Sequence, residues 1–249
     1  MSESTYIYGK NAIIEALERQ ERTFNKILIS STIHRDEKIE QIKELAKIYG
    51  IIFQFVKKEK LDLLTEKSNH QGVVALISPV KYCELEDFIN ANENNENASV
   101  IILDGVEDPH NLGAIIRTAV CAGINGIILP SRRCALVNSI VEKTSAGAVN
   151  HISIIKVNSL VNALQRLKEK NYWVIASDHH AKDNCYDINY TDMKFALIMG
   201  AEHTVISKSL LKLSDFVVKI PMLTKFNSLN VSNATAIILF EYVRQKISK

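Results

Sequence analysis

Glycine is scarce in this chain: it occurs 9 times in 249 residues, against a usual share of about 7%. After Gly147 the only glycine is Gly200. Because so few positions have this backbone freedom, each glycine is a candidate for a specific structural or binding role. No GxGxxG sequence occurs, which excludes the usual dinucleotide-binding fingerprint.

Cysteine is also scarce, and its spacing is informative. The four cysteines lie far apart and form no CxxC pair, which argues against a disulfide scaffold or a structural zinc module and fits a reducing cytosol. No apolar run approaches 18 residues, so we expect no membrane span. The formal net charge of +2 excludes a basic coat over the whole surface but allows a local basic patch. We therefore expect a soluble, cytoplasmic protein without a metal site.

Charge and composition divide the chain into three segments. Residues 1–80 carry 12 basic and 11 acidic side chains, residues 81–98 carry 1 and 5, and residues 99–249 carry 17 and 12. The middle segment contains a polar, asparagine-rich run over residues 90–97, which is typical of a solvated linker or a frayed helix end. We therefore predict a first domain over residues 1–80, a linker over 81–98 and a second domain over 99–249.

Both domains alternate strand-like and helix-like segments. In the first, helix patterns and short apolar runs predict helices over residues 11–18 and 36–49 and strands over 26–30, 51–56 and 73–78. In the second, the predicted strands are 100–103, 126–129, 152–157, 173–176, 195–199 and 217–220. The predicted helices are 110–122, 139–146, 159–169, 207–211 and 228–246. This pattern predicts an α/β fold with a parallel sheet covered on both faces, and such sheets bind ligands at the carboxyl ends of their strands.

The junction after the first strand of the second domain combines polar residues with a glycine. Asn111 is suited to cap the following helix, and Gly113 and Arg117 are four positions apart on one helix face. Because Gly113 has no side chain, the Arg117 guanidinium has room to hold a phosphate in a fork geometry. A capped helix with a packing glycine and a surface arginine explains the same spacing, so both interpretations stay open.

Two later junctions carry similar signals. Gly200 ends an apolar strand and Glu202 follows it, a pattern that fits a ligand-binding loop or an ordinary turn. After the strand that ends at Ile220, a polar loop leads to Ser228, which is suited to cap the last helix and would place Asn230 in its first turn, near free amides. Judged on these residues alone, Ser228 and Asn230 are more often capping residues than catalysts.

Two other groups of side chains give weaker signals. His179 and His180 beside Asp178 are metal-ligand types, but adjacent histidines on a strand face different ways, which favours a solvated loop over a metal site. The adjacent pair Arg132 and Arg133 fits either a phosphate-binding site or two solvated surface side chains. Neither group is part of the predicted site.

The order of the three junctions resembles the SpoU-type, or TrmH-like, RNA ribose 2′-O-methyltransferases of the SPOUT superfamily. Four segments match, and together they are specific where each alone is not: residues 111–119, 199–202, 220–222 and 228–232. Residues 8–12 and 70–75 match the start and end of that family's ribosomal-protein-like substrate-binding domain, so the resemblance covers almost the whole chain. The nearest branch is that of the ribosomal RNA guanosine methyltransferases with this extension.

The resemblance implies a C-terminal SPOUT domain with a deep trefoil knot and a small N-terminal α/β substrate-binding domain. It implies that backbone groups at Gly200, Ile220 and Leu229, with Met222 nearby, hold S-adenosylmethionine in a bent form. It also implies a homodimer and an RNA substrate, ribosomal RNA rather than transfer RNA. The expected reaction is methylation of a ribose 2′-hydroxyl, which in the nearest branch belongs to a guanosine of large-subunit ribosomal RNA.

By the same resemblance, Arg117 acts at the reacting hydroxyl or its neighbouring phosphate, and four further side chains position the RNA and Arg117. These four are Asn111, Glu202, Ser228 and Asn230. No metal is needed, because the leaving group is a neutral thioether. A guanidinium with a pKa above about 12 is a poor free base, so phosphate clamping, with a phosphate oxygen or water accepting the proton, is the easier chemistry.

Three positions depart from the family pattern, because His203, Val205 and Thr224 occupy places where glycines are usual. Each replacement removes backbone freedom from a cofactor loop. A second interpretation is therefore a non-catalytic RNA-binding or ribosome-assembly factor on the same scaffold, which calorimetry with S-adenosylmethionine would distinguish from an enzyme. A third, an α/β enzyme for another small metabolite, predicts no salt-sensitive affinity for RNA.

Overall fold

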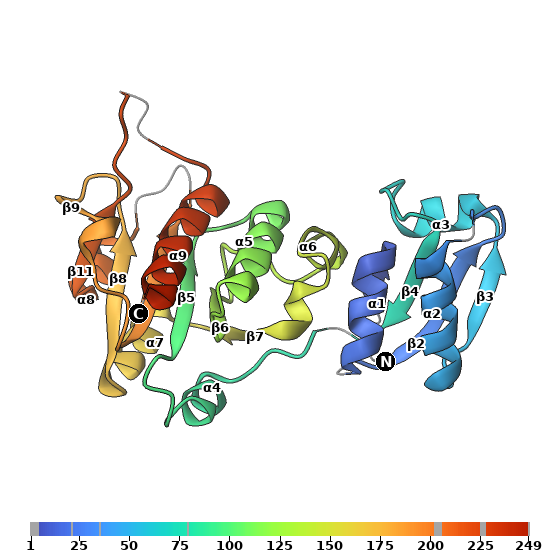
Figure 1. The fold of residues 1–249 in the computed structure, drawn as a ribbon, viewed down its shortest axis with the longest axis horizontal. Helices are drawn as coiled ribbons and strands as arrows, with labels where there is room; N and C mark the ends of the chain where they lie inside the picture. Colours follow the sequence, from blue (N-terminus) through green and yellow to red (C-terminus); the bar gives the residue numbers. More distant parts are fainter. Residues whose placement is uncertain are drawn as a thin grey trace. The chain divides into compact units, whose positions relative to one another are not determined.

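The computed structural model describes residues 5–20, 22–34, 36–78, 80–201, 206–224 and 228–248. The chain forms two compact units (Figure 1). Unit 1 comprises Met1–Lys81 together with Val137–His151, and unit 2 comprises Tyr82–Leu136 together with Ile152–Lys249. Packing thus assigns a segment from far along the chain to the first unit, while the domain boundaries drawn from the sequence stay a prediction.

Unit 1 is built on a four-stranded mixed sheet in the order β1-β4-β2-β3. β4 pairs antiparallel with β1 and β2, and β2 pairs parallel with β3. The strands are β1 (Thr5–Tyr8), β2 (Phe24–Ser30), β3 (Phe53–Val56) and β4 (Val73–Ile77). The sequence predicts β2, β3 and β4 but not β1, which is only four residues long and shows no clear pattern of its own.

Helices cover both faces of the unit 1 sheet. The apolar sides of α1 (Lys10–Arg19) and α2 (Glu37–Ile48) are buried against one face, and α3 (Lys58–Leu64) is buried against the other. α2 begins after Asp36, whose carboxylate accepts a hydrogen bond of 3.1 Å from the amide of Ile39. This cap satisfies one of the amides that a helix start leaves free, and α2 agrees with the predicted helix.

The second chain segment of unit 1 attaches through close packing and a buried ion pair. α6 (Ser139–Thr144) contacts β1, and the 3₁₀ helix η1 (Ala148–His151) contacts α1. Arg22 donates to the carboxylate of Glu142 in α6, and both side chains are buried. Gly147 has a φ of +88°, and a Cβ there would lie 2.5 Å from a side-chain atom of α1. Only glycine fits this approach without strain.

Unit 2 is built on a seven-stranded sheet in the order β7-β6-β5-β10-β8-β11-β9, and every pair of neighbours is parallel. Six strands agree with predicted ones to within a few residues, and the seventh, β9, has only two residues. The strands are β5 (Ser99–Asp104), β6 (Gly126–Pro130), β7 (Ser153–Val157), β8 (Tyr172–Ser177), β9 (Asp183–Asn184), β10 (Lys194–Gly200) and β11 (Phe216–Lys219). The predicted α/β class with a parallel sheet is confirmed, and the knot remains an expectation from the family.

Helices lie on both faces of this sheet (Figure 1). α5 (Pro109–Cys121) and α9 (Val231–Ile247) pack against each other on one face, and α9 also contacts β10. Three helices lie on the other face: α4 (Leu85–Ala91), α7 (Leu160–Glu169) and α8 (Lys208–Leu213). Phe88 of α4 is buried there together with residues of α7 and α8. α4 lies within the segment interpreted as a linker, and its apolar side belongs to the core of unit 2.

Candidate functional site

The carboxyl ends of β5 and β10 lie side by side and bring the first two junctions together. In the parallel register Gly200 pairs with Asp104, the last residue of each strand. The amide of Ala201 donates to the carbonyl oxygen of Asp104 at 3.1 Å, and the amide of Ser207 donates to its carboxylate at 3.2 Å. Asp104 therefore anchors the chain at two points just after Gly200.

The first and third junctions meet where α9 packs on α5. The side-chain oxygen of Asn230 accepts a hydrogen bond of 2.9 Å from the amide of Ser232 and caps α9. The side-chain nitrogen of Asn230 donates to the side-chain oxygen of Asn111 at 2.9 Å, although the two residues are 119 positions apart. All three junctions are thus joined at one edge of the sheet.

Two helix starts differ from the prediction. α5 is capped by Asp108, whose carboxylate accepts an amide hydrogen bond of 2.9 Å, and Pro109 occupies the first helical turn. Asn111 is therefore inside the helix, because proline, with its fixed φ and missing N–H, suits the first position. α9 is capped by Asn230 rather than by Ser228. The side-chain oxygen of Asn230 accepts from the free amide of Ser232, while its side-chain nitrogen donates to Asn111.

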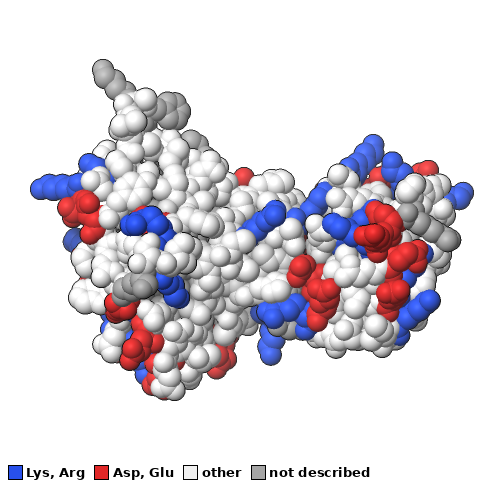
Figure 2. All heavy atoms as spheres, viewed as in Figure 1, with Lys and Arg blue, Asp and Glu red and all other residues white. Residues whose placement is uncertain are grey.

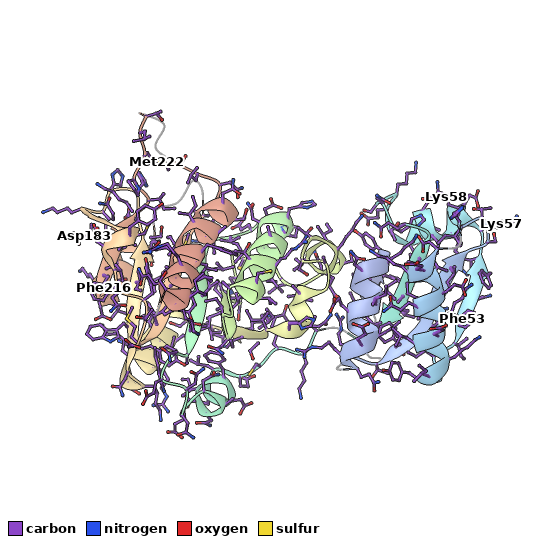
Figure 3. All side chains as sticks on the ribbon, in the orientation of Figure 1. Phe53, Lys57, Lys58, Asp183, Phe216 and Met222 are labelled. Carbon is purple, nitrogen blue, oxygen red and sulfur yellow. The ribbon has the colours of Figure 1, made fainter. Side chains whose placement is uncertain are left out.

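A cavity opens at this edge, where β8, β10 and β11 end. Gly200, Ile220, Met222 and Leu229, the four residues predicted to hold a cofactor, all line it, and so does Ser228. Figure 3 shows Met222 in the loop beyond β11. The remaining lining residues are Ser177, His179, Met199, Ala201, Val231 and Ala234. Of these, Ser177 was missed by sequence reasoning, and His179 was set aside as part of a solvated loop; the signal that finds both is their place at the carboxyl end of β8.

Arg117 lies outside this lining and is exposed on α5. Gly113, one turn earlier, is buried, so its lack of a side chain allows close packing on the buried side of the helix. Arg117 forms no ion pair with any residue that the structure describes.

Part of the second junction falls outside the described residues. Glu202, to which the resemblance gives a role beside Arg117, lies there, as do His203 and Val205. Thr224, the third position where glycine is usual, is described and exposed. The role of Glu202 stays a prediction.

The loop after β6 adds basic side chains beside the first junction. A backbone hydrogen bond of 2.8 Å from the amide of Ala135 ties this loop to the chain that follows β5. Arg132 and Arg133 are exposed on the loop. Burial raises the pKa of the neighbouring Cys134 thiol to about 12, and nearby carboxylates add to the shift. Cys134 is therefore a protonated thiol at neutral pH and is not a nucleophile.

The cavity wall carries little charge. His179 is the only ionisable side chain among the described residues that line it. Nowhere in the described ranges do three or more His, Cys, Asp or Glu side chains gather as metal ligands would. No helix in the described part of the chain is long and apolar enough to cross a membrane. The described lining combines aliphatic side chains with Ser177, His179 and Ser228, and the exposed arginines of α5 and of the loop after β6 can contact a polyanion.

Two family models match the chain in sequence. Residues 98–240 match the "SpoU rRNA Methylase family", and residues 6–83 match "RNA 2'-O ribose methyltransferase substrate binding". The chain is 37% identical over 242 residues to the "Putative TrmH family tRNA/rRNA methyltransferase YacO" of Bacillus subtilis (strain 168), covering 97% of this chain and 96% of that protein. A protein of the same description from Staphylococcus haemolyticus (strain JCSC1435) is 39% identical over 247 residues, covering 98% and 97%.

Solved structures share the same fold. An AdoMet-bound rRNA methyltransferase from Sinorhizobium meliloti has a TM-score of 0.80 and 26% identity, covering 97% of this chain and 87% of that one. The SpoU methyltransferase AviRb from Streptomyces viridochromogenes has a TM-score of 0.83 and 22% identity, covering 98% and 90%. The second likeness concerns the fold alone. Similarity in sequence and in fold therefore extends over nearly the whole chain.

Proposed function

The chain belongs to the SpoU rRNA methylase family, and from that premise we propose that it transfers a methyl group from S-adenosylmethionine to a ribose 2′-hydroxyl of tRNA or rRNA. The observation that carries the proposal is the meeting of the three junctions at one sheet edge. Gly200 pairs with Asp104 there, and Asn230 bonds Asn111. Residues from three distant parts of the chain are thus available to one cofactor and one RNA strand.

The cavity suits S-adenosylmethionine in its chemistry. Gly200 offers backbone groups without a side chain, while Ile220, Leu229 and Met222 offer apolar surface for an adenosine. We assign these four residues to holding the cofactor. When bound, S-adenosylmethionine supplies an electrophilic methyl carbon whose bonding pair returns to sulfur, which leaves a neutral thioether.

The chain's own residues align the ribose and manage its proton. Alignment of the hydroxyl oxygen with the methyl carbon is worth up to about 7–11 kcal/mol. The guanidinium of Arg117, which is always charged, binds the phosphate beside that ribose in a fork geometry. A phosphate oxygen or water then accepts the hydroxyl proton as the new oxygen–carbon bond forms. Asn111, Asn230, Ser228 and Glu202 orient the RNA and Arg117.

Within this function, we propose that the substrate is ribosomal RNA, and specifically a guanosine of the large subunit. The family branch that the sequence resembles supports this choice, and residues 6–83 match a substrate-binding domain. In unit 1, Lys57 and Lys58 are exposed just after β3 (Figure 3), where they can contact phosphates. On the face in Figure 2, basic side chains are interspersed with acidic ones. We expect the affinity for RNA to fall as salt rises, with a slope that reports the number of phosphate contacts.

We also propose that the protein is a homodimer that associates through α9. One side of this helix is buried, yet Phe240 and Ile247 are 50% and 79% exposed. These two apolar side chains are seven positions apart and so lie on one side of the helix, and a second copy is the partner that the resemblance implies. Sedimentation velocity tests this, because Phe240→Glu should convert a dimer into a monomer. A cytoplasmic location stays a prediction.

Arg117→Lys provides the sharpest test of the reaction, because it keeps the positive charge and removes the planar fork. We expect single-turnover methyl transfer from radiolabelled S-adenosylmethionine to fall about 100-fold, the scale of losing one well-placed donor. Cofactor affinity, measured by titration calorimetry, should stay within about twofold, since Arg117 does not line the cavity. Full turnover and RNA affinity in this variant would contradict the fork role.

Ribose-methylation mapping of cellular RNA with and without the gene identifies the nucleotide. We expect one methylated site, on a large-subunit guanosine, to disappear. A protein that binds RNA in a salt-sensitive way but does not bind S-adenosylmethionine would instead be a non-catalytic RNA-binding factor. A protein that binds neither would point to an enzyme for another small metabolite.

A further inference from the structure

His179 is a residue of the cavity wall that the proposed reaction does not use. It lies just beyond the end of β8, and β8 pairs with β10 on one side and with β11 on the other. These two neighbours lead to Gly200 and Ile220, which are both assigned to the cofactor. His179 therefore lies beside both strand ends, and its imidazole is the only ring among the described residues of the lining.

Hydrogen bonds around Asp178 fix the loop that carries this imidazole. The amide of Asp178 donates to the carbonyl oxygen of Val218 in β11 at 2.9 Å. The Asp178 carboxylate accepts from the amide of His180 at 2.8 Å, and its carbonyl oxygen accepts from the amide of Ala181 at 3.0 Å. The rings of His179 and His180 lie with centroids 3.8 Å apart and their planes tilted by 40°. This turn fixes the backbone at His179 before any ligand arrives.

We propose that the imidazole of His179 stacks on the adenine ring of bound S-adenosylmethionine and so helps the site to select a purine cofactor. This inference rests on the proposed function. The imidazole is the only flat ring in the described lining, and it has one matching part in this ligand, the purine. Stacking of an aromatic side chain on a base depends on the π-face of the base and not on its hydrogen-bonding edge.

The amino-acid end of the cofactor is a poorer match for His179. That end carries an ammonium and a carboxylate, which need several polar or charged partners when they leave water. The described lining offers Ser177 and Ser228 as its only other polar side chains. The edge of adenine, in contrast, is well served by backbone N–H and C=O groups, which strand ends provide.

Titration calorimetry on the full-length protein tests the proposal with two ligands. S-adenosylhomocysteine contains both the adenine and the amino-acid end, whereas 5′-methylthioadenosine contains the adenine and lacks the amino acid. We expect His179→Ala to weaken both ligands by about tenfold, the scale of one lost stacking contact, and His179→Phe to keep both within about twofold. His180→Ala, which removes the adjacent imidazole outside the lining, is the matched control and should stay near the wild type. Thermal unfolding of each variant verifies that it is folded.

Three results would overturn the proposal, and each has a distinct meaning. If His179→Ala weakens S-adenosylhomocysteine and leaves 5′-methylthioadenosine unchanged, the imidazole binds the amino-acid end instead. If His179→Ala and His180→Ala bind both ligands as the wild type does, His179 makes no contact with the cofactor. If the wild type binds neither ligand, the proposed function itself fails and the stacking role fails with it.

Discussion

Two glutamates that pair with arginines, one in each unit, are affected in opposite ways by their surroundings. In unit 1, burial raises the pKa of Glu142, and the charge and hydrogen bond of Arg22 oppose this shift. In unit 2, Arg244 donates two hydrogen bonds of 2.8 Å to Glu241 and lowers its pKa. The arginines differ in solvent access, since the side chain of Arg22 is 5% exposed and that of Arg244 is 63% exposed. Solvent access therefore decides how much each pair matters to the fold.

Few other described groups can replace either partner of the buried pair between Arg22 and Glu142. Arg22 also donates to the carbonyl oxygen of Ser78, at 2.8 Å from Nε and 2.5 Å from a terminal nitrogen. Oε2 of Glu142 is buried and has no hydrogen-bond partner in the described part of the chain. Removal of Arg22 would therefore leave the whole carboxylate without a strong donor. The pair connects α6 to the rest of unit 1, so its loss should loosen that attachment.

The largest effect is expected from Arg22→Met, which leaves the buried carboxylate of Glu142 without its ion-pair partner. We expect the free energy of unfolding to fall by about 3–5 kcal/mol, the usual cost of removing one partner of a buried pair. Urea unfolding at neutral pH measures it. Arg166→Met is the matched control, because Arg166 makes an exposed pair with Glu86 at 2.7 Å, and its effect should be much smaller. Equal losses in the two variants would refute the distinction between buried and exposed pairs.

The pH dependence of the same variant sharpens the comparison. Without Arg22, burial acts on Glu142 unopposed, so its pKa in the folded state lies above its ordinary value of 4.5. A group with a raised pKa favours folding below its unfolded pKa and loses that contribution as pH rises through the folded pKa. The destabilisation by Arg22→Met should therefore be smallest below pH 4.5 and grow above it. A penalty that is constant from acidic to neutral pH would contradict this.

The sequence predicts the elements of unit 2 better than it predicts their contacts. Apolar runs locate six strands, and the strand-end rule points to Gly200, whereas Ile220 was assigned through the family resemblance. The bond between Asn230 and Asn111 could not be predicted from spacing, because it joins residues 119 positions apart. It depends on the order β5-β10-β8-β11 in the sheet, which differs from the order in the chain. The family resemblance assigned both residues to positioning the RNA and Arg117, but it did not predict the hydrogen bond between them.

The attachment of α6 to unit 1 was missed for a different physical reason. Glu142 belongs to a six-residue helix in which a carboxylate normally faces water. Its burial depends on Arg22, which lies 120 positions earlier, so no local pattern reveals it. α4 was obscured in another way, because the polar run over residues 90–97 follows directly after the buried Phe88 and Ile89. Composition averaged over the whole segment conceals two core residues.

A smaller effect is expected where the contact between distant segments is neutral rather than ionic. Asn230→Ala removes the cap of α9, worth about 1 kcal/mol, and the hydrogen bond to Asn111, worth about as much. We expect urea unfolding to show a loss of about 1–2 kcal/mol. Asn233→Ala is the matched control, because Asn233 is exposed in the first turns of the same helix, and it should be nearly neutral.

A double-mutant cycle isolates the contact between the two asparagines. If the hydrogen bond is formed, Asn111→Ala and Asn230→Ala together should cost less than the sum of the two single variants, with a coupling of about 0.5–1.5 kcal/mol. Strict additivity would show that the two side chains do not interact in solution. The third junction would then be joined to the first only through helix packing.

The smallest effect is expected from Glu241→Gln, at the pair of unit 2 in which the glutamate is 6% exposed and its arginine is 63% exposed. Because Arg244 is largely solvated, the loss at neutral pH should stay below about 1 kcal/mol, even though Glu241 also accepts a 2.7 Å hydrogen bond from Gln245. The pKa of Glu241 is lowered from 4.5, so its contribution to stability is present above that value and is lost as pH falls through the folded pKa. The difference between wild type and variant should hence be constant from pH 7 to about pH 5 and vanish in acid. The destabilisation by Arg22→Met changes above pH 4.5, whereas the destabilisation by Glu241→Gln changes below it. Urea unfolding across this range therefore distinguishes burial from hydrogen bonding. If both differences varied over the same pH range, solvent access would not be what separates the two pairs.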